Sequence, residues 1–171
     1  MATSFELFSL QGRIALITGS SQGIGFALAR GLAEHGAKVI VNGRDRNKVD
    51  AAVTRLEEEG HRVFASTFDV TDAEEARAAI DLIEKEIGPL DILVNNAGMQ
   101  YRTALEDFPI EKWQQLLETN VSSAFYVGQA VARHMIPRGY GKIINIASVQ
   151  SELARPSIAP YTATKGAIRN L

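Results

Sequence analysis

The feature that most constrains this chain is the glycine-rich segment TGSSQGIG at residues 18–25, which stands between a short apolar run (13–18) and a stretch with helical periodicity (24–34). A tight turn from a strand into a helix needs glycine where φ is positive or where the backbone must approach a ligand closely. The helix N-terminus that follows offers free amide donors and a positive dipole end to a phosphate. The segment alone also fits a structural glycine turn, but its place between a strand and a helix predicts a dinucleotide site.

Strand-like and helical segments alternate along the rest of the chain. Strands are predicted at residues 13–18, 38–42, 62–68, 90–95 and 141–147. Helices are predicted at residues 24–34, 47–59, 71–87, 110–135 and from 161 onward, the third opening with a capping-box pattern at Thr71. Short β-branched runs separated by helices indicate parallel strands buried on both faces. The predicted fold is α/β, a doubly wound, three-layer parallel sheet of the Rossmann type, with ligands outside the carboxyl ends of the strands.

The sequence stops at Leu171, ten residues past Tyr161 and inside the last predicted helix. We therefore expect residues 1–171 to be a single dinucleotide-binding domain that is truncated before its last strands. Without a further strand beside it, the segment 141–147 presents unpaired amides and β-branched side chains at a sheet edge, a pattern that invites aggregation. We expect a molecule that ends at Leu171 to be weakly soluble and essentially inactive.

The end of the second strand indicates which dinucleotide binds. An NAD site usually carries an acidic residue here, which holds the ribose 2′-hydroxyl. This chain has Asn42, Gly43 and Arg44 instead, and Asp45 comes one residue later than a ribose ligand should. A guanidinium can bind a 2′-phosphate through two hydrogen bonds. Arg44 alone also fits a solvated loop residue, but the missing carboxylate favours NADP.

Polar or small residues also follow the third and fourth strands. In the segment 68–70, FDV, the Asp69 carboxylate and the Val70 amide are placed to meet the adenine edge, and the segment 95–98, NNAG, lets a cofactor pass close to the backbone. Each segment alone is also a turn former, yet the carboxyl ends of parallel strands meet at one edge of a sheet. The residues predicted to bind the cofactor are Gly19, Ser21, Gln22, Gly23, Ile24, Gly25, Arg44, Asp69, Val70, Asn96, Ala97 and Gly98.

Polar residues in the second half of the chain form a candidate catalytic group. Tyr161 and Lys165 are four residues apart, on one face of a helix. A phenol ionises near pH 10 in water, and a nearby ammonium in a poorly solvated cleft favours the phenolate that acid–base chemistry needs. The Ser148 hydroxyl follows the fifth strand and can bond a substrate oxygen, and Asn120 can anchor a water that passes protons to Lys165. Each residue alone also fits an ordinary structural role.

Taken in order, TGSSQGIG, NNAG, Asn120, Ser148 and the Tyr161/Lys165 pair resemble the short-chain dehydrogenase/reductase family over residues 13–171. The resemblance implies Tyr161 as the catalytic acid–base, and Lys165 as both a ribose ligand and the residue that favours the Tyr161 phenolate. It implies Ser148 as the stabiliser of the substrate oxygen and Asn120 as the water anchor of a proton relay. Tyr161 and Lys165 thereby join the cofactor ligands, and a homotetramer is expected for the full-length protein.

The candidate substrate site is polar, with Arg102 after the fourth strand and Gln150 and Glu152 after the fifth. A steroid or a fatty acyl chain needs an apolar lining, whereas an arginine near the carbonyl suits a carboxylate-bearing substrate. Two alternatives stay open, because Glu152 can pair with Arg155 and Arg102 can be a solvated loop residue. The residues expected to bind substrate are Arg102, Ser148, Gln150 and Tyr161.

The segments SVQSELARPSIAPYTATKGA, NNAGMQYR and HMIPRGYGKIINIAS resemble family members that act on keto sugar acids. This resemblance implies reversible reduction of 5-ketogluconate to gluconate with NADPH. One alternative is a 3-oxoacyl-carrier-protein reductase, which shares every catalytic residue. A second is a non-catalytic dinucleotide-binding fragment, against which the complete set of Asn120, Ser148, Tyr161 and Lys165 argues.

Composition and charge exclude other classes. A formal charge of −2 gives no reason to expect nucleic acid or an anionic membrane as partner. The absence of cysteine excludes a disulfide framework and a thiolate metal site, and we expect no metal. Residues 1–13 lack the pattern of a secretory signal, and the longest apolar runs are too short for a membrane span. The expected location is the cytoplasm.

Overall fold

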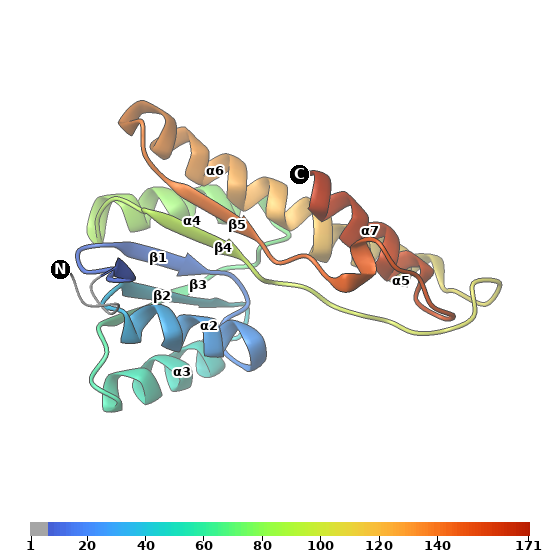
Figure 1. Ribbon diagram of the computed structural model, residues 1–171, viewed down its shortest axis with the longest axis horizontal. Helices are drawn as coiled ribbons and strands as arrows, with labels where there is room; N and C mark the ends of the chain where they lie inside the picture. Colours follow the sequence, from blue (N-terminus) through green and yellow to red (C-terminus); the bar gives the residue numbers. More distant parts are fainter. Residues whose placement is uncertain (1–6) are drawn as a thin grey trace.

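The computed structural model describes residues 7–171, which form one parallel sheet of five strands with helices on both faces (Figure 1). The strands are β1 (Ile14–Ile17), β2 (Lys38–Gly43), β3 (Val63–Thr67), β4 (Ile92–Asn95) and β5 (Lys142–Asn145). The helices are α2 (Gly23–Glu34), α3 (Arg46–Glu58), α4 (Ala73–Glu86), α5 (Ile110–Leu117), α6 (Ser123–Arg138) and α7 (Ala159–Asn170). The predicted doubly wound α/β fold is confirmed.

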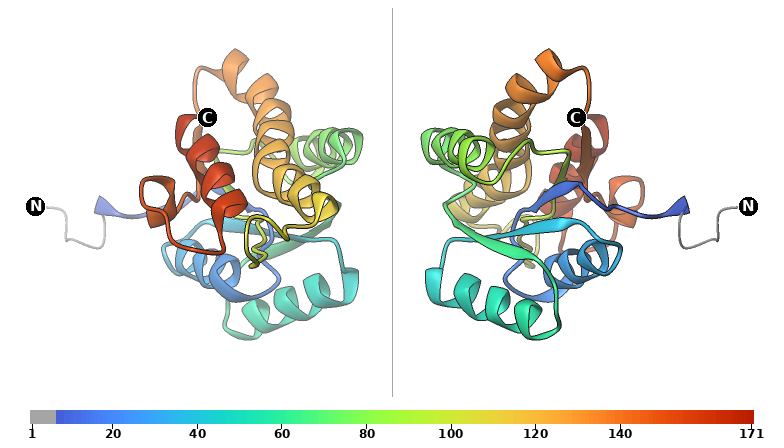
Figure 2. Two further views of the ribbon diagram at one scale, coloured as in Figure 1. Left: turned by 90° about the vertical axis from the view of Figure 1, so that its right-hand side faces the viewer. Right: turned by 90° about the vertical axis from the view of Figure 1, so that its left-hand side faces the viewer.

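The order of the strands, β3-β2-β1-β4-β5, places a switch point between β1 and β4. The chain moves outward from β1 to β3 and then returns to the other side of β1, so the crossover helices cover opposite faces of the sheet (Figure 2). Side chains alternate between these faces with a period of two. Leu16 and Ile40 pack in one cluster with α4 and α6, whereas Ile17 and Val41 pack in the other with α2 and α3. Ligands of doubly wound sheets bind at such a switch point.

Three sequence expectations need correction. Helix α4 is not capped at Thr71: the Asp72 carboxylate accepts hydrogen bonds from the amides of Glu74 and Glu75, both at 2.9 Å, so the N-cap lies one residue later than predicted and the helix begins at Ala73. The helix predicted over 110–135 is interrupted by a π-helical segment, η1 (Glu118–Ser122). Burial on both faces holds for the central strands but not for β5, which is largely exposed at the edge of the sheet.

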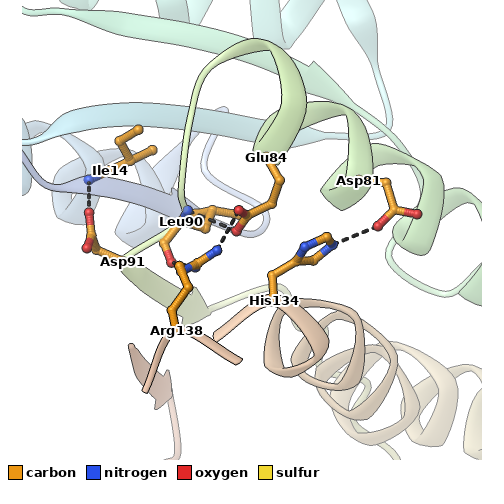
Figure 3. Close-up of polar contacts among 7 residues, drawn as sticks. All are labelled: Ile14, Asp81, Glu84, Leu90, Asp91, His134 and Arg138. Carbon is orange, nitrogen blue, oxygen red and sulfur yellow. Dashed lines mark hydrogen bonds and ion pairs between the residues drawn. The ribbon is translucent and has the colours of Figure 1, made fainter. Parts of the chain in front are cut away.

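Helices α4 and α6 are joined by polar contacts that also fix the start of β4 (Figure 3). The His134 ring lies 2.7 Å from the Asp81 carboxylate, and the Arg138 guanidinium lies 2.6 Å from the Glu84 carboxylate. Glu84 also accepts a hydrogen bond from the Leu90 amide at 3.0 Å, while Arg138 donates to the Leu90 carbonyl at 2.7 Å. The amide and the carbonyl of Leu90, just ahead of β4, are therefore both hydrogen-bonded to side chains of these two helices.

Strand β5 pairs in parallel with β4 and forms an edge of the sheet over residues 7–171. Ile143 and Ile144 on this strand are about half exposed, as expected for an apolar edge without a neighbouring strand. Among the described residues, none of the helices combines the length and the apolarity that crossing a membrane requires. The expectation about a secretory signal concerns a segment whose first six residues lie outside the described part of the chain.

Candidate active site

A cavity of about 470 Å³ lies at the carboxyl ends of β1 to β4, at the switch point of the sheet. The predicted cofactor residues of the first four strand ends all line it: Gly19, Ser21, Gln22, Gly23, Ile24, Gly25, Arg44, Asp69, Val70, Asn96, Ala97 and Gly98. The cavity is bounded by the glycine-rich turn and by the three strand ends that follow in the sequence. The fold thus brings together segments, from Gly19 to Gly98, that are separated by nearly half of the chain.

Glycines make the close packing of this turn possible. A Cβ atom on Gly25 would lie 2.5 Å from Asn96 Nδ2 and 2.5 Å from the Gly19 carbonyl oxygen, so a side chain cannot fit there. Gly19 has φ +61°, and a Cβ atom on it would lie 3.0 Å from the Ala97 Cα. Gly23 also has a positive φ, +62°, but nothing lies within 4 Å of its Cβ position. Gly19 and Gly25 therefore allow the turn to pack closely against the end of β4, while Gly23 leaves open space at the start of α2.

Two buried residues that the sequence reasoning missed hold this arrangement. The Thr18 hydroxyl accepts hydrogen bonds from the amides of Asn96 and Ala97, both at 3.0 Å, and so connects the ends of β1 and β4. The Asn42 carboxamide accepts from the Gly19 amide at 3.1 Å and donates to carbonyls at the end of β3 at 3.2 Å. Polar residues at the carboxyl ends of apolar strands were the signal that could have identified both.

Charged residues gather at the ends of β2 and β3. The Arg44 guanidinium lies 3.7 Å from the Asp69 carboxylate, which also accepts hydrogen bonds from the amide and the hydroxyl of Thr71. Asp45 serves as the N-cap of α3, because its carboxylate accepts from the Lys48 amide at 3.3 Å. Its carboxylate is therefore engaged by a helix terminus. Lys48 lines the same cavity and is a second cation that the sequence analysis did not single out.

The Tyr161 and Lys165 side chains lie on α7, with the Lys165 ammonium 5.9 Å from the centre of the Tyr161 ring. Lys165 is only 7% exposed, so this is not a surface helix pair. Its ammonium donates a hydrogen bond to the Ile146 carbonyl at 2.6 Å, next to the end of β5. Burial lowers the pKa of the Lys165 ammonium below its ordinary value, because the charged form loses hydration in the protein interior.

Ser148 is the N-cap of a 3₁₀ turn, η2 (Val149–Ser151), that connects β5 to α7. Its hydroxyl oxygen accepts a hydrogen bond from the Gln150 amide at 3.1 Å. A serine hydroxyl has one proton to donate besides its lone pairs, so this contact leaves the Ser148 proton available to another acceptor. The position is compatible with the predicted bond to a substrate oxygen, which stays a prediction.

Asn120 lies in η1, is 2% exposed and connects two separate segments. Its Oδ1 atom accepts from the Met99 amide at 2.7 Å, and its Nδ2 atom donates to the Met99 carbonyl and to the Thr164 hydroxyl, both at 3.0 Å. Thr164 in turn donates to the Tyr161 carbonyl at 2.8 Å. Both amide protons of Asn120 are therefore used within the protein, and its role as a water anchor stays a prediction. π-Helical segments often occur at functional sites.

Of the predicted substrate residues, Arg102 lies in the loop after β4, Ser148 and Gln150 lie in the loop between β5 and α7 that includes η2, and Tyr161 lies on α7. The two loops contact each other. The amide of Thr103, in the loop after β4, donates to the Ser157 carbonyl, in the loop after η2, at 3.2 Å. Arg102 is exposed on the first of these loops. On the second, the Oε1 atom of Gln150 is buried and has no hydrogen-bond partner among the described residues. Their contact with a substrate stays a prediction.

Glu152, in the loop between β5 and α7, pairs with a residue other than Arg155. The Glu152 carboxylate lies 3.1 Å from the Arg169 guanidinium on α7. The pairing of Glu152 with Arg155 is therefore wrong, because the loop turns Glu152 toward the end of α7. Both members of the observed pair are more than half exposed, and such pairs contribute little to stability.

A doubly wound sheet with a glycine-lined cavity at its switch point defines the class of dinucleotide-binding α/β proteins. The model of the short chain dehydrogenase family matches residues 13–171, and the chain belongs to this family. It is 57% identical over 166 residues to the gluconate 5-dehydrogenase of Gluconobacter oxydans (strain 621H), and 49% identical over 166 residues to the 5-keto-D-gluconate 5-reductase of Escherichia coli (strain K12). Each match covers 97% of this chain and 65% of the relative, so the chain spans about two thirds of the length of these proteins.

A solved structure of high similarity is that of a gluconate 5-dehydrogenase from Burkholderia cenocepacia J2315 in complex with NADP and tartrate. It is 54% identical to this chain and superposes with a TM-score of 0.95, covering 98% of this chain and 66% of that structure. The likeness therefore extends over both the cofactor cavity and the segments that carry Ser148, Tyr161 and Lys165.

Proposed function

We propose that the protein is an NADP-dependent oxidoreductase that transfers a hydride reversibly between NADPH and a keto sugar acid, with 5-ketogluconate and gluconate as the pair. The observation that carries the proposal is the buried Lys165 ammonium beside Tyr161, held next to the end of β5, where Ser148 follows. Cofactor binding can use the Lys165 cation, but it does not need a phenol that can give and take a proton beside it, so the pair supports acid–base chemistry. The names of relatives at 57% and 49% identity support the choice of substrate.

The residues around the cavity fit a dinucleotide with a 2′-phosphate. The turn at the start of α2 leaves open space at Gly23, where helix amides can meet the pyrophosphate. Arg44 and Lys48 line the cavity without a free acidic residue at the tip of β2, since Asp45 caps α3. We assign these cations to the 2′-phosphate and Asp69 with Val70 to the adenine edge. The bound nicotinamide supplies or accepts the hydride.

The protein's own residues manage the proton. Tyr161 gives a proton to the substrate oxygen during reduction and takes it back during oxidation. The Lys165 ammonium places a positive charge beside the Tyr161 ring in a poorly hydrated part of the site, and we assign it a second role as a ribose ligand of the cofactor. Ser148 donates a hydrogen bond to the same substrate oxygen and keeps it beside Tyr161. These roles follow from the chemistry of the side chains and from the family to which the chain belongs.

Arg102 and Gln150 complete the proposed substrate site, with Arg102 facing the sugar-acid carboxylate. The assay is NADPH oxidation with 5-ketogluconate and with an uncharged ketone. Arg102→Ala should raise the KM for 5-ketogluconate by about tenfold or more, the value of a charge-assisted contact, and leave the KM for the uncharged ketone nearly unchanged. An equal rise in KM for both substrates would show that Arg102 has a structural role instead. Turnover of 3-oxoacyl carrier protein in place of 5-ketogluconate would identify the alternative enzyme.

We also propose that residues 1–171 act as one dinucleotide-binding domain and that the full-length protein is a homotetramer in the cytoplasm. The support is the resemblance to the family rather than a contact in this chain. Light scattering coupled to size-exclusion chromatography measures the assembly directly. A monomer at micromolar concentration would contradict the proposed tetramer, and fractionation of cells tests the location.

A further inference from the structure

A single hydroxyl group connects the backbones of two residues in the proposed catalytic group. The Ser148 amide donates a hydrogen bond to Ser151 Oγ at 3.3 Å, and Ser151 Oγ donates to the Lys165 carbonyl at 2.8 Å. Ser148 and Lys165 belong to different elements, the turn η2 and the helix α7. Ser151 therefore links the backbones of Ser148 and Lys165 through two successive hydrogen bonds.

Little else in the hydrogen-bond pattern ties the η2 turn to α7. Glu152 and Arg169 also join these segments, but their ion pair is more than half exposed and is screened by solvent. The bond between the Lys165 ammonium and the Ile146 carbonyl reaches the chain ahead of Ser148, not the turn itself. Within the turn, the Ser148 carbonyl accepts from the Ser151 amide at 2.9 Å. The Ser151 hydroxyl therefore carries the one partly buried hydrogen bond that the structure gives between η2 and α7.

We propose that Ser151 is a positioning residue that sets the placement of the Ser148 hydroxyl relative to Tyr161 and Lys165. The inference rests on the proposed function, because it assumes that Ser148 and Tyr161 act on the same substrate oxygen. A hydroxyl is required here, since it accepts from one backbone group and donates to another at the same time. Misplacement of a reacting group by about 1 Å can cost about a hundredfold in rate, so a loose η2 turn lowers turnover without touching the cofactor cavity.

The test compares Ser151→Ala, which removes the hydroxyl, with Ser151→Thr, which keeps it. The matched control is Thr162→Val, because the Thr162 hydroxyl is buried on α7, the helix that accepts the Ser151 hydrogen bond, and has no hydrogen-bond partner among the described residues. For each variant, kcat and KM for 5-ketogluconate, the Kd for NADPH and the exchange of the Ser148 and Ser151 amide hydrogens are measured. Amide exchange reports the opening of the turn and needs no turnover.

We expect Ser151→Ala to lower kcat by about ten- to a hundredfold, with the Kd for NADPH within about twofold and faster amide exchange in η2. Ser151→Thr should restore most of kcat and the slow exchange, and Thr162→Val should match the unmodified protein. A kcat within about twofold of the unmodified protein, or unchanged exchange in Ser151→Ala, would overturn the inference. A parallel loss of NADPH binding would also overturn it, because the damage would then be global. An unmodified protein that binds NADPH but reduces no keto sugar acid would instead reject the proposed function, a result that the exchange measurement distinguishes from failure of the hydroxyl bridge.

Discussion

The cofactor cavity and the catalytic group are built in different ways. The cavity lies at the ends of the central strands β1 and β4, whose side chains are buried, and glycines, backbone amides and a few charged side chains line it. The proposed catalytic residues lie on η1, η2 and α7, beyond a strand that is largely exposed. They are held by side-chain hydrogen bonds between distant segments, such as those of Asn120 with Met99 and Thr164. The sheet, with the Thr18 and Asn42 side chains at its carboxyl edge, fixes the first site, whereas a few hydroxyl and amide groups between η1, η2 and α7 fix the second.

This contrast predicts how each site fails. The cavity should be most sensitive to added volume, because close-packed backbone cannot move apart without cost. The catalytic group should tolerate small changes in volume but not loss of a hydrogen-bonding atom, since each such atom joins two elements. Substitutions in the catalytic group should therefore leave the Kd for NADPH nearly unchanged.

The largest effect is expected at Tyr161. Tyr161→Phe removes the hydroxyl that gives and takes the proton, and kcat should fall by at least a hundredfold, in the range typical for loss of a general acid–base. The Kd for NADPH should stay within about twofold, because the ring can still pack. Stopped-flow turnover and fluorescence titration of NADPH measure the two quantities. Retention of more than about a tenth of kcat would remove Tyr161 from its proposed role.

The cavity should respond most strongly at Gly25. Gly25→Ala places a Cβ atom 2.5 Å from both Asn96 Nδ2 and the Gly19 carbonyl oxygen, so NADPH binding should be lost and the free energy of unfolding should fall by about 1–3 kcal/mol, the cost of an overpacked site. Gly31→Ala is the matched control on the same helix. Nothing lies within 4 Å of its Cβ position, and alanine should stabilise the helix by about 0.5–1 kcal/mol. Similar thermal unfolding of both variants would contradict the packing argument.

A smaller effect is expected from Arg44, which lines the cavity. Arg44→Ala should weaken NADPH binding by about tenfold or more, from loss of a charge-assisted contact, and change NADH binding little. Arg46→Ala is the control, because Arg46 pairs with Asp50 on the exposed surface of α3. Titration of both cofactors gives the ratio of the dissociation constants. Equal affinities for NADPH and NADH in the unmodified protein would reject the predicted preference.

The smallest effect concerns the dependence of stability on pH. Because burial lowers the pKa of Lys165 in the folded state, the unfolded chain binds more protons between the lowered and the ordinary lysine pKa. The unfolding free energy of the unmodified protein should therefore rise with pH across that window, relative to Lys165→Met, which has no titrating group. Denaturant unfolding at several alkaline pH values measures the difference. A difference that falls as pH rises would show that the Lys165 ammonium is stabilised, not penalised, by its site.

The sequence by itself determined the elements and the cofactor side of the molecule. The strand at 13–18 and the segment 18–25 are local patterns, since apolar periodicity and glycine placement act over a few residues. The ends of the first four predicted strands therefore appear at the cavity, including Arg44 and Asp69. The sheet needs only these local patterns and the rule that parallel strands end at one edge.

Only the tertiary structure decided how the catalytic residues are held. Besides their local partners, Asn120, Thr164 and Ser151 form hydrogen bonds to residues between 14 and 44 positions away, and no local pattern identifies such pairs. The π-helical segment at Asn120 and the pairing of Glu152 with Arg169 have the same origin, because both depend on where α7 packs. Local propensity fixes which atoms can form hydrogen bonds, whereas long-range packing fixes which of them meet.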